Sequence, residues 1–248
     1  MSGAYAVGVS DERRHPRHPT SSDEELLEAE TAAIVSELSD QARLERIDEE
    51  LREGFAALSR VGKAVSIFGS ARTPPGDPQY EQARRLARLL GAAGWAIITG
   101  GGPGIMEAAN RGAQEVGATS IGLDIELPRE QAMNGYVDVG LTFHYFFARK
   151  VMFVRYASAF VAFPGGFGTL DELFEAATLR QTQKIRHFPI VLVGADYWRG
   201  LLDWLRDPVL REAKIGPEDV ERLQVVDEPA EVLAILDDVE HRRPRKAT

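Results

Sequence analysis

The sequence predicts a Rossmann-like α/β fold: a doubly wound, mainly parallel sheet with helices on both faces, preceded by an N-terminal helical extension. Three observations predict it. Short apolar runs alternate with amphipathic segments along the chain. These runs contain few polar residues, which is typical of strands that helices cover on both sides. Two of them end in glycine-rich loops that each open a helix.

The first half of the expected sheet begins at residue 64, after the N-terminal helical extension. Strands are expected at residues 64–68, 95–98 and 119–123, with a shorter one at 137–141. Asp77 is a good N-cap for a helix over 77–93, and a second helix is expected over 105–116.

The second half repeats this alternation. Strands are expected at 159–163, 189–193 and 224–226, and helices at 143–156, 169–182, 197–205 and from 229 onward. Connections between parallel strands need such crossover helices.

Three regions are expected along the chain. Residues 1–20 lack periodicity and are expected to be a disordered leader. Residues 21–60 carry apolar side chains at three- and four-residue steps, which predicts one helix or a pair. Their apolar stripe packs either on the same protomer or on a second subunit. Residues 61–240 are expected to form one Rossmann-like domain.

Composition excludes several classes of protein. The 248 residues carry a formal net charge of -9, which argues against a nucleic-acid partner. The absence of Cys excludes disulfides, thiolate metal sites and a Cys nucleophile. No apolar stretch approaches the ~20 residues of a membrane span. We expect a soluble, cytoplasmic protein without a metal.

The two glycine loops are Thr99–Gly104 and Pro164–Thr169. Glycines let a ligand approach the backbone, and the N-terminus of the following helix favours an anion. Either loop could instead be a tight connection only. Neither has the GxxxxGK[ST] pattern of nucleoside triphosphatases or the GxGxxG dinucleotide fingerprint, so a single terminal phosphate is expected.

Three side chains near these loops can carry chemistry. Glu172 lies one helical turn beyond Thr169, although a capping box of these two residues is an alternative. Arg149 and Lys150 lie on a helix rich in core-type residues. Cations there require a carboxylate or phosphate partner, unless they snorkel to the surface.

Four segments resemble the LONELY GUY (LOG) family of cytokinin riboside 5'-monophosphate phosphoribohydrolases, often labelled "lysine decarboxylase". They are Phe68–Arg72, Gly100–Glu107, Arg149-Lys150 and Pro164–Glu172, the last carrying the PGGxGTxxE motif. The resemblance covers about Val65 to Leu205. It implies hydrolysis of the N-glycosidic bond of an adenosine 5'-monophosphate, possibly N6-modified, to the free base and ribose 5-phosphate. It also implies a homodimer or a higher homo-oligomer, and no cofactor.

The resemblance also implies site residues. The family's catalytic pair falls on Arg149 and Glu172. The 5'-phosphate is expected at Gly165, Gly166, Gly168 and Thr169. The further substrate-binding candidates are Ser70, Gly102, Glu107 and Lys150. Compact members carry Met-His-Glu before the Arg-Lys, where this chain has Phe146-Phe147-Ala148, and residues 126–140 are longer than theirs.

Competing hypotheses make different demands. A non-catalytic nucleotide-binding or sensing protein needs the loops but not the Arg149/Glu172 pair. A pyridoxal phosphate decarboxylase needs a Schiff-base lysine, and no lysine has an evident context for it. A DNA-processing relative conflicts with the acidic charge.

Overall fold

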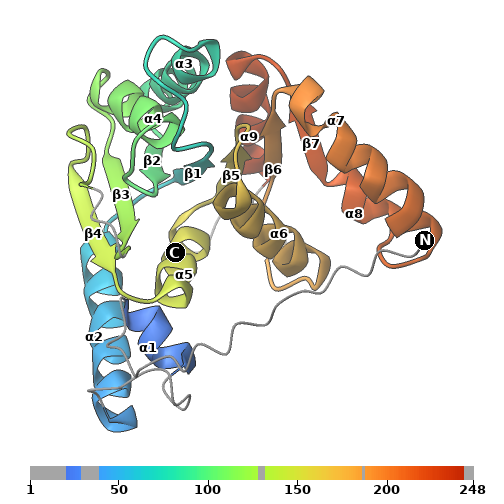
Figure 1. Ribbon diagram of the computed structural model, residues 1–248. Coiled ribbons are helices and arrows are strands. Elements are labelled where there is room, and N and C mark those ends of the chain that lie inside the picture. The colour runs from blue at the N-terminus through green and yellow to red at the C-terminus, as the bar shows by residue number, and fades with distance from the viewer. Residues whose placement is uncertain (1–20, 29–38, 128–131, 186–187, 243–248) are drawn as a thin grey trace, which may run out of the picture.

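A computed structural model describes residues 21–28, 39–127, 132–185 and 188–242. Its centre is a seven-stranded sheet in the order β4-β3-β2-β1-β5-β6-β7, and every neighbouring pair is parallel (Figure 1). The strands are β1 Ala64–Phe68, β2 Ala96–Thr99, β3 Ser120–Ile125, β4 Val139–Phe143, β5 Ala159–Ala162, β6 Ile190–Val193 and β7 Leu223–Val226. The predicted fold class is therefore confirmed.

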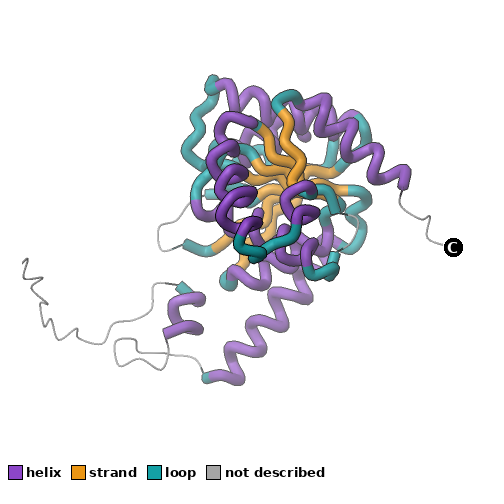
Figure 2. Tube along the Cα trace, turned by 90° about the vertical axis from the view of Figure 1, so that its right-hand side faces the viewer, coloured by secondary structure: helices purple, strands orange, loops and turns teal. Residues whose placement is uncertain are grey.

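Helices cover both faces of this sheet, with one apolar cluster under each layer. One layer contains α3 Pro78–Ala92, α4 Ile105–Gln114 and α9 Pro229–Arg242. The other contains α5 Phe146–Tyr156, α6 Phe167–Gln181, α7 Ala195–Trp204 and α8 Pro217–Glu221, with a π-helical turn η1 at Leu205–Val209. Figure 2 shows the strands enclosed between these helices.

The N-terminal helices are α1 Ser22–Glu28 and α2 Asp40–Leu58, and they extend from one side of the sheet (Figures 1 and 2). Gly54 of α2 lies against Met152 of α5, where an added Cβ would come within 2.7 Å of the Met152 methyl group. The expected leader, residues 1–20, lies outside the described residues. No helix in the described part of the chain is long and apolar enough to cross a membrane.

Several predicted boundaries are wrong by about two residues, among them the ends of β3 and β4 and the starts of α5, α6 and α7. Residues 139–143 pair with β3, so Phe143 belongs to a strand and α5 begins only at Phe146. Helix α6 begins at Phe167 after an extended Gly166 N-cap, two residues before the predicted start. Thr169 therefore lies inside the first turn, and the Thr169/Glu172 capping box is also wrong, because Thr169 is not the N-cap.

Strand order places the binding region. The chain runs outward from β1 to β4 and then returns to β5 on the other side of β1. The carboxyl ends of β1 and β5 thus flank the switch in strand order, where open α/β sheets bind ligands. The second glycine loop follows β5 directly, whereas the first follows β2, one strand away.

Candidate active site

Ser70 joins the two glycine loops at the switch point. Its N–H donates to the Pro164 carbonyl at 3.0 Å, and its carbonyl accepts from Ile105 N–H, also at 3.0 Å. Its hydroxyl accepts from the Arg72 N–H at 3.0 Å. Ser70, a predicted substrate-binding residue, thus holds the starts of α4 and of the second loop in register.

The second loop is open to solvent at the N-terminus of α6. No side chain caps the N-cap residue Gly166, so the first N–H groups of the helix remain available to an anion. An added Cβ at Gly166 or Gly168 would meet nothing within 4 Å. At Gly165 it would meet the Thr169 hydroxyl at 2.1 Å, so this position accepts only glycine. The Gly165 carbonyl accepts from the Tyr197 hydroxyl at 2.5 Å.

The first loop is filled by protein. The amide of Asn134 donates to the carbonyls of Gly101 at 2.9 Å and Gly102 at 3.0 Å. The Gly101 N–H donates to the Thr99 hydroxyl at 2.9 Å, and that hydroxyl donates to the buried Asn110 side chain at 2.6 Å. The carbonyl of Gly102, a predicted substrate-binding residue, is thus already occupied within the chain.

Glu172 lies at the open loop as a buried carboxylate. The residue is 3% exposed, and its Oε2 has no hydrogen-bond partner. Burial raises the pKa of Glu172 to about 7, although the charges of Lys150 and Arg149 act in the opposite direction. A carboxyl group in this state can change protonation near neutral pH.

Arg149 faces the first loop from α5. Its side chain lies beside Gly100, where an added Cβ would be 3.5 Å from Nη2. The Nε atom is buried without a hydrogen-bond partner. Burial lowers the pKa of Arg149, whereas Glu172 and Asp124 favour its charged form. The guanidinium also lies 5.1 Å from the centre of the Phe153 ring.

Lys150 is held by carboxylates of α6. Its Nζ lies 2.9 Å from Asp171, 3.1 Å from Glu175 and 3.7 Å from Glu172. Burial opposes the charge of Lys150, but the Asp171 hydrogen bond and the neighbouring carboxylates raise its pKa. This arrangement fits a residue that positions α6 against α5 better than one with free donors for a substrate.

Glu107 contacts helix α3 and not the other predicted site residues reported above. Its carboxylate accepts from the Tyr80 hydroxyl at 2.8 Å, toward α3. Burial and this hydrogen bond raise the pKa of Tyr80 to about 12. Of the predicted site residues, the structure brings Lys150 and Glu172 together on the α5 and α6 side of the site, with Ser70 between the loops. Arg149 lies beside the first loop and interacts electrostatically with Glu172. Glu107 instead contacts the α3 layer.

Sequence reasoning missed Asp124 and Asn134. Asp124 is a half-buried carboxylate near the end of β3, and it interacts electrostatically with Arg149. Burial raises the pKa of Asp124. An acidic residue inside an otherwise apolar strand was a signal that could have found it. Asn134 lies in a segment whose irregular sequence gave no such signal.

The N-terminal helices contact the start of α5, which carries Arg149. The buried Glu50 of α2 accepts from the His144 backbone N–H at 3.2 Å and pairs with its ring Nδ1 at 2.8 Å. Asp23 of α1 accepts from the Phe146 N–H at 3.2 Å. Tyr145, the N-cap of α5, provides no side-chain cap itself. Asp23 therefore occupies one of the N–H groups that a helix start leaves unpaired, whereas Glu50 holds the residue just before the N-cap.

Metal ligands do not gather in this region. Among the described residues, no group of three or more His, Cys, Asp or Glu side chains could hold a metal ion.

Solved structures share this fold. The molybdenum cofactor carrier protein of Chlamydomonas reinhardtii aligns with a TM-score of 0.55 at 23% identity, covering 73% of this chain and 99% of that one. The molybdenum cofactor binding protein of Rippkaea orientalis aligns with a TM-score of 0.51 at 22% identity, covering 71% and 95%. At these identities the likeness concerns the fold alone.

Sequence relatives identify the family. A cytokinin riboside 5'-monophosphate phosphoribohydrolase of Mycobacterium tuberculosis is 33% identical over 168 residues, 63% of this chain and 87% of the relative. The enzyme LOG7 of Arabidopsis thaliana is 31% identical over 161 residues, 62% and 72%. The family model described as "Possible lysine decarboxylase" matches residues 106–236. This chain therefore belongs to the LOG family, which that model represents.

Proposed function

We propose that the chain is a phosphoribohydrolase that cleaves the N-glycosidic bond of a nucleoside 5'-monophosphate, with adenine or an N6-modified adenine as the base. One observation carries this proposal. The buried Glu172 Oε2 and the buried Arg149 Nε have no hydrogen-bond partner, the two residues interact electrostatically, and Glu172 lies in the helix whose N-terminus is open. Buried polar atoms are rarely left unsatisfied, so a polar ligand between them is a physical reason for both. The names of the relatives supply the reaction class.

Glu172 is the proposed catalytic carboxylate. Cleavage of the C1'–N bond leaves oxocarbenium character on the ribose, and an ionised carboxylate stabilises it. The same carboxylate orients a water molecule, whose oxygen bonds to C1' while one of its protons is transferred to Glu172. The base takes the electron pair of the broken bond and the proton that the water gave to Glu172, which restores the carboxylate. The products are the free base and ribose 5-phosphate.

Arg149 and the second loop are the proposed binding groups. The planar guanidinium can donate two parallel hydrogen bonds to ribose hydroxyls and hold the sugar against Glu172. The N–H groups of Phe167, Gly168 and Thr169, with the α6 dipole, are suited to the 5'-phosphate. Phosphate binding then supplies orientation energy remote from the reacting bond. In this scheme Ser70 and Lys150 position the two loops and α6.

A substrate panel tests the proposal. The purified chain is incubated with AMP, N6-isopentenyl-AMP, GMP, CMP and adenosine, and the released base and ribose 5-phosphate are measured by chromatography. We expect release from at least one adenine nucleotide and at least a hundredfold less from adenosine, which lacks the phosphate.

The main alternative is a nucleotide-binding protein without turnover. It predicts saturable AMP binding by calorimetry with no release of base from any nucleotide on the panel. Equal turnover of adenosine and AMP would instead contradict the phosphate site at the second loop.

A homodimer is part of the proposal. Large apolar side chains are exposed on two helices that contact each other, namely Phe55 on α2 and Phe146, Phe147 and Val151 on α5. Exposed apolar groups gathered in this way are typical of an interface. Light scattering of the purified chain, with Phe147→Asp as the disrupting variant, tests the oligomeric state.

The same proposal assigns residues 21–60 as a helical extension and 61–240 as the catalytic domain, in a cytoplasmic protein. Limited proteolysis followed by mass spectrometry tests the boundary, and cell fractionation tests the location.

A further inference from the structure

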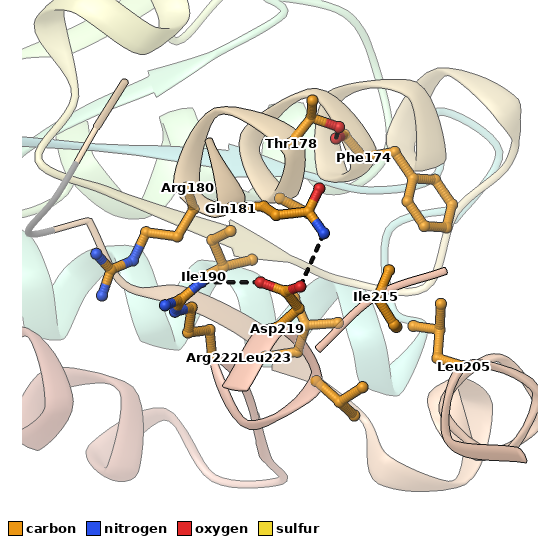
Figure 3. Close-up of a pocket in the computed structure, with 12 residues that line it drawn as sticks. Phe174, Thr178, Arg180, Gln181, Ile190, Leu205, Ile215, Asp219, Arg222 and Leu223 are labelled. Atoms are coloured by element: carbon orange, nitrogen blue, oxygen red, sulfur yellow. Dashed lines mark hydrogen bonds and ion pairs between the residues drawn. The ribbon is translucent and has the colours of Figure 1, made fainter. Parts of the chain in front are cut away.

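A pocket lies along α6 from Phe174 to Gln181 (Figure 3). It is a cavity of about 110 Å³ between α6, β6, η1, α8 and β7. Glu172 and Arg180 of α6 are eight residues apart, which is roughly 12 Å along a helix. None of the residues proposed above for nucleotide hydrolysis lines this cavity.

The walls of the pocket are mostly apolar. The apolar side chains include Phe174, Ala177, Ile190, Leu205, Ile215 and Leu223. Figure 3 shows the Arg180 guanidinium at one end of the pocket and Phe174, Leu205 and Ile215 at the other. The pocket is therefore polarised, with positive charge at one end and hydrocarbon at the other.

The carboxylate in this pocket already has its partners. Asp219 accepts from the Gln181 side chain at 2.7 Å and from the Gly216 N–H at 2.9 Å. It also pairs with Arg222 at 2.8 Å. These three contacts hold Asp219 and Arg222 as one neutral pair at the wall, as the dashed lines of Figure 3 mark for the two side-chain contacts.

Arg180 is the uncompensated charge. Within the described ranges, its guanidinium has no ion pair or side-chain hydrogen bond, while Arg222 lies close enough to repel it. Burial lowers the pKa of Arg180, and the charge of Arg222 lowers it further. Two arginines against one aspartate leave one positive charge in the lining. Arg180 lies in the last turn of α6, where the helix dipole stabilises a positive charge. The dipole does not explain why Arg222 lies beside it.

The backbone around the pocket is unusual. The turn η1, which contributes Leu205 and contains Pro208, is π-helical. Two non-glycine residues among those described have positive φ, Gln183 at 59° just after α6 and Ala213 at 54° just before Ile215. π-Helical turns and left-handed non-glycine residues cost energy and cluster at functional sites.

We infer that this pocket binds a small organic monoanion with an apolar body, a carboxylate held by Arg180 beside Arg222 with its body against Phe174, Leu205 and Ile215. One negative charge matches the net charge of the lining. On the other side of the two arginines lies a second hollow whose lining includes Glu221 and Asp238, so an anion is favoured only from the apolar side. The site is separate from nucleotide hydrolysis.

Calorimetry with 2-naphthoate and its neutral analogue 2-naphthylmethanol tests this inference on the full chain. We expect saturable binding of 2-naphthoate and at least tenfold weaker binding of the alcohol, because the charged hydrogen bond is lost. Arg180→Gln should weaken 2-naphthoate binding at least tenfold, whereas Arg180→Lys should retain it within about threefold. The matched control is Arg211→Gln, since Arg211 pairs with Asp207 on the exposed surface.

Ala177→Leu fills the cavity from α6 without changing a charge, and it should also abolish binding. If thermal unfolding shows that Arg180→Gln is not folded, Ala177→Leu alone tests the pocket. The inference is overturned if wild type binds no 2-naphthoate at millimolar concentration, or if the alcohol binds equally well. It is also overturned if binding survives both Arg180→Gln and Ala177→Leu. If only Arg149→Gln removes binding, 2-naphthoate binds at the nucleotide site and the inference is again overturned. Failure of nucleotide hydrolysis would leave these outcomes unchanged.

Discussion

The two glycine loops follow strands on opposite sides of β1 and each opens a helix, yet they differ in what occupies them. The carbonyls of Gly101 and Gly102 in the first loop accept hydrogen bonds from Asn134. In the second, Gly166 and Gly168 face open space at the start of α6. A glycine-rich turn thus indicates that something approaches the backbone closely. Whether that group is protein or ligand depends on residues distant in sequence.

The largest expected effect is the loss of kcat/KM when Glu172, the carboxylate beside the second loop, is replaced. Glu172→Gln keeps the size of the side chain but removes the charge proposed to stabilise the oxocarbenium ion. We expect kcat/KM for the best nucleotide to fall by about 10³-fold, within the range for a general acid–base group. The control is Glu212→Gln, an exposed carboxylate between η1 and α8. Turnover within threefold of wild type would remove Glu172 from the catalytic role.

Replacing one glycine of each loop with alanine should lower stability in the first loop and raise KM in the second. Gly104 has a φ of 70°, and an added Cβ would lie 2.3 Å from the Ser70 carbonyl oxygen. We expect Gly104→Ala to lower the free energy of unfolding by about 3 kcal/mol, measured by urea denaturation.

Gly168→Ala is the matched variant in the second loop, where an added methyl group meets no protein atom. We expect its free energy of unfolding to stay within about 1 kcal/mol of wild type. Its KM should rise about tenfold because the methyl group lies where the phosphate is proposed to bind. The comparison of the loops fails if Gly104→Ala is as stable as wild type, or if Gly168→Ala leaves KM unchanged.

The difference between the loops also marks what sequence could predict. The parallel sheet was predictable because its strands are continuous apolar runs, and Glu172 and Arg149 were found through short motifs. The start of α6 was misjudged because Gly166 takes an extended conformation that no local pattern specifies. Asn134 was missed because its contacts with Gly101 cross 33 residues of chain. Long-range polar contacts of this kind leave no periodic signal.

Removing the group that fills the first loop should change stability more than catalysis. Asn134→Ala leaves the buried carbonyls of Gly101 and Gly102 and the Asn110 side chain without this donor. We expect the free energy of unfolding to fall by about 2 kcal/mol, measured by urea denaturation. The value of kcat/KM should fall less than about fivefold. A collapse of kcat/KM at unchanged stability would instead make the first loop the phosphate site and reverse the comparison.

The pH dependence of Glu172 gives the finest test of the open loop. Burial raises its pKa from an ordinary value of 4.5 to about 7. Below pH 4.5 the carboxyl group is protonated in both folded and unfolded chains, so it contributes no pH dependence there. Between these two values the unfolded chain ionises first, so stability is lost as the pH rises, by on the order of 2–3 kcal/mol in all. Urea denaturation from pH 4 to 9 should show this loss in wild type and a flatter profile in Glu172→Gln.

Catalysis should change in the opposite direction over the same range. The proposed reaction needs the ionised carboxylate, so kcat/KM should rise about tenfold per pH unit below 7 and level off above it. The substrate phosphate also titrates near pH 6, and the residual activity of Glu172→Gln isolates that contribution because it lacks the carboxyl group. If wild-type kcat/KM instead falls as the pH rises through 7, the protonated form is the active one. Glu172 would then donate a proton to the departing base, and the attacking water would need another carboxylate, for which Asp124 is a candidate because it interacts with Arg149.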